Sequence, residues 1–79
     1  MRRIMRKIIH FNISKGDQYY VADCNELPIV TQGITLDETI ANIQEALQLH
    51  LEDEDLNELM ISKSPAVSIN LDLGEFEYA

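Results

Sequence analysis

Few residues of this 79-residue chain belong to the types that usually carry catalysis. The histidines are His10 and His50, and the one cysteine is Cys24. A histidine that acts as a general base needs an orienting carboxylate and a substrate pocket, and a nucleophilic thiol needs a base beside it. The spacing of these three residues indicates neither arrangement. We therefore interpret the histidines as surface residues and Cys24 as a small strand residue, and we predict no enzymatic activity, no catalytic residue and no cofactor.

The densest group of possible metal ligands is the acidic run at residues 52–55. Hard cations such as Ca²⁺ prefer oxygen ligands, which makes these carboxylates candidates. Four consecutive residues on a helix point in four different directions, however, and the glycine-centred spacing of a calcium loop does not follow the run. The sequence therefore predicts a solvated acidic junction and no metal site.

The charge of the chain is divided unevenly along its length. The 14 acids and 6 bases give a formal net charge of -8, yet residues 1–15 contain no acid and every base except Lys63. An acidic body repels phosphate and favours a basic protein partner, mainly through the rate of association. We therefore expect no direct binding of nucleic acid.

Length and composition predict one domain that spans residues 1–79. A chain of this length forms one small core, and its 46% hydrophobic content is typical of a globular fold. A lone cysteine suits a reducing compartment. The basic start lacks the apolar run of a signal peptide, and no segment approaches the ~20 apolar residues of a membrane helix. We predict a cytoplasmic location and no contact with a membrane.

The first part of the chain predicts a hairpin and a third strand. Apolar and polar residues alternate near the end of the segment 4–14, and β-branched and aromatic residues recur over 18–24. Between these segments, Gly16 allows a tight turn. Pro28 cannot donate to a strand ladder, so the second strand ends before it. The short run 29–32 predicts the third strand.

A helix follows the third strand. Thr35 and Glu38 have the spacing of a capping box, in which the threonine oxygen accepts a backbone N–H and the glutamate reaches back. Apolar residues then recur every three or four positions along one face: Leu36, Ile40, Ile43, Leu47 and Leu51. The acidic run predicts a break, because acids oppose the dipole at a helix C-terminus. A short second helix is predicted from Asp55 to Met60.

The last predicted element is a strand. Lys63, Ser64 and Pro65 end the second helix, and apolar residues then alternate with polar ones at positions 67, 69, 71 and 73. The fold class is therefore α+β. We expect a two-layer sandwich with an antiparallel three- to four-stranded sheet and helices on one face, in the order β-β-β-α-α-β. Because the chain is too short to cover both faces of that sheet, we expect one face to be exposed to solvent or covered by another chain.

Five short runs within residues 19–51 resemble the N-terminal domain of HicB antitoxins. They are YYVADCNELP (19–28), VTQG (30–33), TLDE (35–38), IANI (40–43) and EAL (45–47). The family combines a strand, a proline-containing turn and a capped helix in this order. Ile29 departs from the pattern, because the family usually has glycine after the proline.

The resemblance implies a partial RNase H-like fold that neutralises HicA, a small mRNA-degrading toxin, and that performs no catalysis itself. Many HicB proteins continue into a DNA-binding domain, and we expect this chain to be a solitary HicB-like domain without one. The resulting hypothesis is an antitoxin domain that binds and masks a small basic HicA-type toxin. Its candidate contact residues are the acids of the helix junction and an exposed strand face: Glu52, Asp53, Glu54, Asp55 and Tyr20.

A second hypothesis treats the chain as a homo-oligomeric regulatory or ligand-binding module without a toxin partner. The uncovered sheet face and the last alternating strand offer an edge that can pair with a second copy. We therefore expect a homo-oligomer, a dimer or a larger assembly, under either hypothesis.

Overall fold

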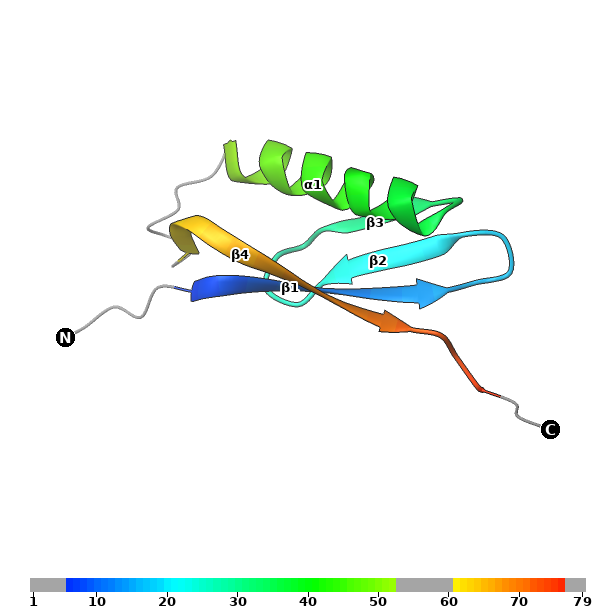
Figure 1. Ribbon diagram of the computed structural model, residues 1–79. Coiled ribbons are helices and arrows are strands. Elements are labelled where there is room, and N and C mark those ends of the chain that lie inside the picture. Colours follow the sequence, from blue (N-terminus) through cyan, green and yellow to red (C-terminus); the bar gives the residue numbers. More distant parts are fainter. Residues whose placement is uncertain (1–5, 53–60, 77–79) are drawn as a thin grey trace.

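The computed structural model describes residues 6–52 and 61–76 of the chain (Figure 1). In this part the elements are β1 (Arg6–Lys15), β2 (Tyr20–Cys24), β3 (Val30–Gly33), α1 (Leu36–Glu52) and β4 (Ile61–Asp72). The four strands form one sheet in the order β3-β2-β1-β4, and α1 lies on one face of it (Figure 1). The α+β class predicted from the sequence is confirmed.

The sheet is mixed, so the prediction of an antiparallel sheet is wrong for its last strand. β2 runs antiparallel to both β1 and β3, whereas β4 lies beside β1 and runs parallel to it. The physical reason is the crossover through α1. Because the helix runs back over the sheet, the chain re-enters at the end where β3 began and continues in the direction of β1 and β3. Alternation within a strand carries no information about that direction.

The predicted second helix, from Asp55 to Met60, lies outside the described residues. Residues 63–65 were expected to end it, but they lie inside β4. The register shifts here: Arg6 pairs with Ile61 and Ile8 with Ala66, so one residue of β1 lies opposite four residues of β4, 62–65. An irregular edge strand tolerates Pro65, because its missing N–H interrupts no regular ladder.

The entry into α1 follows the threonine half of the predicted capping box. Thr35 Oγ1 accepts the backbone N–H of Glu38 at 3.1 Å, which satisfies one of the free donors at a helix N-terminus. Thr39 is fully buried, and its hydroxyl donates to the carbonyl oxygen of Thr35 at 2.8 Å. A Cβ on Gly33 would lie 2.6 Å from the backbone nitrogen of Thr39. The turn from β3 into α1 therefore requires glycine.

The core lies between α1 and the inner face of the sheet, the face toward the helix. Its central side chains are Ile9, Phe11 and Ile13 of β1, all fully buried, with Ile43 and Leu47 of α1 packed against the same cluster. The remaining residues of the predicted helix stripe, at positions 36, 40 and 51, are partly buried beside it. The predicted apolar face of the helix is thus confirmed.

The helix does not cover the whole inner face. α1 contacts β3 and β2 (Figure 1), while β4 lies at the opposite edge beyond β1. Val67, Ile69 and Leu71 of β4 pair with the buried residues 9, 11 and 13 of β1. Paired residues point to the same face of a sheet, yet these three are 42%, 37% and 38% exposed. The inner face of β4 is therefore an apolar surface without cover from α1.

Candidate functional site

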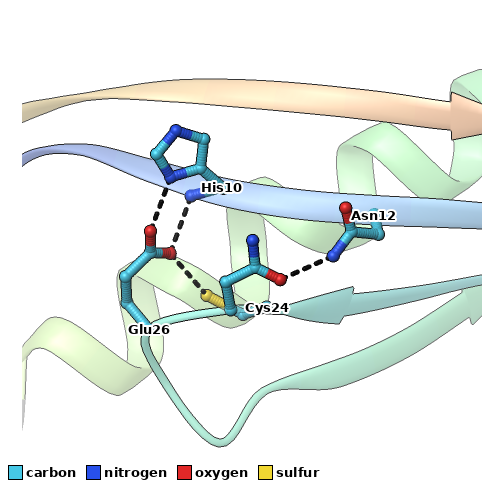
Figure 2. Close-up of polar contacts among 5 residues, drawn as sticks. His10, Asn12, Cys24 and Glu26 are labelled. Carbon is cyan, nitrogen blue, oxygen red and sulfur yellow. Dashed lines mark hydrogen bonds and ion pairs between the residues drawn. The ribbon is translucent and has the colours of Figure 1, made fainter.

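A polar cluster joins β1 to the connection between β2 and β3 (Figure 2). The Glu26 carboxylate accepts the backbone N–H of His10 at 2.8 Å through Oε1, and its Oε2 lies 2.6 Å from His10 Nδ1. The backbone N–H of Asn25 donates to the carbonyl oxygen of His10 at 2.9 Å. Asn12 Nδ2 donates to Asn25 Oδ1 at 2.6 Å. Beyond the end of β2, the Glu26 carboxylate thus takes the place of the strand carbonyl that would otherwise accept the backbone N–H of His10.

Burial and hydrogen bonding oppose each other at this carboxyl. The Glu26 side chain is 8% exposed, whereas that of His10 is 48% exposed. Burial alone raises the pKa of Glu26, but the hydrogen bonds from the His10 side chain and backbone outweigh it and hold the pKa below its usual value. Glu26 therefore stays ionised near neutral pH and attaches the β2–β3 connection firmly to β1.

The thiol of Cys24 lies at the margin of this cluster. Its Sγ donates to Glu26 Oε1 at 3.7 Å. Burial, together with the negative charge of Glu26, raises the pKa of Cys24 above its ordinary value. A protonated thiol is a weak nucleophile, so the cluster favours a structural over a nucleophilic role for Cys24.

Sequence reasoning found no carboxylate for either histidine, and the fold supplies one to His10. Glu26 is 16 residues away in the chain, in a segment that the sequence marked as a turn. No local pattern predicts this contact, because it depends on the pairing of β1 with β2. Among the residues the structure describes, no three His, Cys, Asp or Glu side chains lie close enough together to hold a metal ion.

The solvent-facing side of α1 is a second candidate site. Its exposed charged residues are all acidic: Asp37, Glu38, Glu45 and Glu52. Leu49 is 57% exposed, with Glu45 four positions before it and Glu52 three positions after it. Residues at these spacings are neighbours on a helix surface. We call Glu45, Leu49 and Glu52 the acidic helix face.

The predicted contact residues fall in different places. Glu52 is exposed at the end of α1 and belongs to the acidic helix face. Asp53, Glu54 and Asp55 lie outside the described residues. Tyr20 was expected on an exposed strand face, but it lies on the inner face of β2, opposite Gly33, and is partly buried against the core. The side chains at positions 19 and 21 are the more exposed ones in this segment.

Comparisons with protein-family models, with curated proteins and with solved structures find no match to this chain. Within residues 6–52 and 61–76, no helix is long and apolar enough to cross a membrane.

Proposed function

We propose that this chain is a HicB-like antitoxin domain that binds and masks a small basic HicA-type toxin through the acidic helix face. The observation that carries the proposal is that the exposed charged side chains of α1 are all acidic. A surface of one sign attracts a partner of the opposite sign and speeds the encounter. An RNA-degrading toxin needs basic residues to hold phosphate, so an acidic surface is complementary to it.

The position of the acids within the helix supports a role in binding. Carboxylates near a helix C-terminus face the negative end of the dipole and destabilise the helix slightly. Glu52 is in this position, and the acidic run continues after it. A basic partner would offset that local repulsion. Exposed Leu49 adds an apolar contact within the charged surface, in keeping with interfaces whose apolar centre is surrounded by polar residues.

The order of the elements also supports the family assignment on which this proposal rests. In the described residues, three strands, one helix and a further strand follow one another. The three strands, the first helix and the last strand keep the sequence positions expected for them, whereas the expected second helix is not among these elements. The resembling runs form β2, β3 and α1 together with the connections between these elements.

The test is co-expression of the chain with the product of an adjacent small basic reading frame, followed by co-purification and a growth assay. We expect co-elution and relief of toxicity. The double variant Glu45→Lys/Glu52→Lys should lose both, because it reverses the charge of the acidic helix face. The matched control is Asp17→Lys/Asp23→Lys, which makes the same change in net charge at exposed positions outside the helix. Equal loss in both double variants, or no co-elution of the natural chain, would contradict the proposal.

A second candidate is a homo-oligomeric regulatory module, and the uncovered apolar side of β4 favours it. Self-association and toxin binding are compatible, because they use different sides of the molecule.

A further inference from the structure

The strand β4 combines an uncovered face with an open edge. Its inner side presents Val67, Ile69 and Leu71, each between 37% and 42% exposed, although all three lie beside fully buried residues of β1. In the sheet of the described residues, β4 is also the terminal strand, next to β1 alone. An open edge carries unpaired backbone donors and acceptors, which are a template for another strand.

The middle of β4 lacks the usual protection of a sheet edge. Charged side chains, bulges and short length keep edge strands from pairing with other chains. From Ala66 to Asp72 the strand is regular and pairs residue by residue with β1. No residue from 64 to 71 is charged. The irregular part of the strand, which contains Pro65, lies before this segment.

We propose that β4 pairs antiparallel with β4 of a second copy of this chain, so that two four-stranded sheets join into one continuous sheet. The inference is independent of toxin binding. The joined sheet would have the order β3-β2-β1-β4 from one copy, followed by β4-β1-β2-β3 from the second. The free backbone groups of each β4 edge would then be hydrogen-bonded by the other.

A two-fold axis through Ile69 gives the most complete pairing. It lies at the centre of the regular segment 66–72, so all seven residues find partners. On the inner face, Ile69 meets Ile69 of the second copy, and Val67 meets its Leu71. On the outer face, Ser68 meets Asn70 of the second copy, which allows hydrogen bonding. Asp72 lies opposite Ala66 of the second copy, so no like charges meet directly.

Charge favours a second copy as the occupant of this strand. An uncharged segment offers no attraction specific to a basic protein, whereas two acidic chains can meet there without opposing carboxylates. The acidic helix faces also stay far apart, because α1 lies over β3 and β2 and β4 is the opposite edge (Figure 1). The remaining repulsion between two chains of charge -8 is screened by salt.

Sedimentation equilibrium of the full chain at micromolar concentrations tests the assembly. We expect twice the monomer mass of 9.1 kDa, with association strengthened between about 0.05 M and about 1 M salt. Val67→Lys should weaken association by about tenfold or more, because it places a cation in the proposed interface between the two β4 strands. Val21→Lys is the matched control. Val21 is also 42% exposed, but it lies on β2, between β3 and β1 in the sheet, so this variant should leave association unchanged. A monomer at these concentrations, or equal effects of both variants, would overturn the proposal.

Cross-linking tests the register and does not depend on a lysine variant that folds. Directly opposed residues of an antiparallel pair have Cα atoms about 4.5–5.5 Å apart, within reach of a disulfide. In a Cys24→Ser background, Ile69→Cys should form a covalent dimer under mild oxidation, whereas Asp72→Cys should not. Cross-linking at position 72 in preference to position 69 would overturn the register. Glu45→Lys/Glu52→Lys should leave the dimer intact. Loss of toxin binding and loss of the β4–β4 pairing can therefore be told apart.

Discussion

The two edges of the sheet, β3 and β4, show opposite solutions to the same problem. β3 has four residues, and the amide of Asn42 in α1 donates to its Gln32 carbonyl oxygen at 2.7 Å. β4 has twelve residues, an uncovered apolar side and no neighbour beyond it among the described residues. The helix thus packs against β3 and engages one backbone acceptor there, whereas it leaves the apolar side of β4 without cover. Under the proposed pairing of two copies, the β3 half would stabilise the monomer and the β4 half would serve association.

The largest expected effect compares two neighbouring strands on the inner face of the sheet: β1, which the helix covers, and β4, which it does not. Ile13→Ala removes a fully buried side chain of β1 and should destabilise the fold by about 2–5 kcal/mol. Ile69→Ala removes a side chain that is 37% exposed and should destabilise the monomer by roughly 1 kcal/mol. Urea unfolding at protein concentrations low enough to keep the chain monomeric measures both values. Equal losses of stability would show that β4 is as firmly packed as β1.

The glycines at the C-terminal ends of the two edge strands, Gly33 as the last residue of β3 and Gly74 two residues beyond β4, give the next largest contrast. Gly33→Ala would bring a Cβ within 2.9 Å or less of three atoms of Thr39, two of them backbone atoms. Removal of the threonine side chain therefore cannot relieve the clash, and we expect a loss of about 1–3 kcal/mol.

Gly74, beyond the end of β4, has a φ of 79° and open space where an added Cβ would lie. Gly74→Ala should therefore lower stability only through its left-handed backbone, by about 1 kcal/mol. Thermal or urea unfolding of the two variants compares them. A larger loss for Gly74→Ala than for Gly33→Ala would contradict the view that the β3 end is the tightly packed one.

The Glu26 cluster should make the stability of the β2–β3 connection depend on pH. The pKa of Glu26 is lowered in the folded chain, so its contribution is present above the ordinary carboxyl pKa of about 4.3 and is lost as the pH falls through the folded value. Glu26→Gln should lower stability by roughly 1 kcal/mol at pH 7 and by less at pH 3. Urea unfolding at both pH values measures the difference, with Asp23→Asn as an exposed control. A Glu26→Gln effect of equal size at both pH values would contradict this assignment.

The smallest expected effect concerns the protection of β3 by the helix. Asn42→Ala removes the donor to the Gln32 carbonyl oxygen and should lower stability by about 0.5–1 kcal/mol. Amide hydrogen exchange in β3 should become faster while exchange in β1 is unchanged. Gln44→Ala, at an exposed position of the same helix, serves as the control and should leave β3 exchange as it is.

Local patterns were sufficient to predict most of the elements. The capping spacing from Thr35 to Glu38 and the apolar stripe predicted α1, because both depend on neighbours within one helical turn. Alternation around Phe11 and Ile69 predicted β1 and much of β4. The candidate site was predicted less well. Glu52 lies on the acidic helix face, but Tyr20 points toward the core, since alternation identifies the two faces of a strand without saying which one the helix covers.

Composition and periodicity by themselves determined an acidic chain of the α+β class, with a capped amphipathic helix after a hairpin. Only the tertiary structure decided that β4 runs parallel to β1, that Glu26 bonds His10, and that α1 leaves the inner side of β4 uncovered. The physical reason is the range of the interactions. Helix caps and side-chain alternation involve residues a few positions apart, whereas strand order and the placement of a helix on a sheet depend on contacts between distant segments.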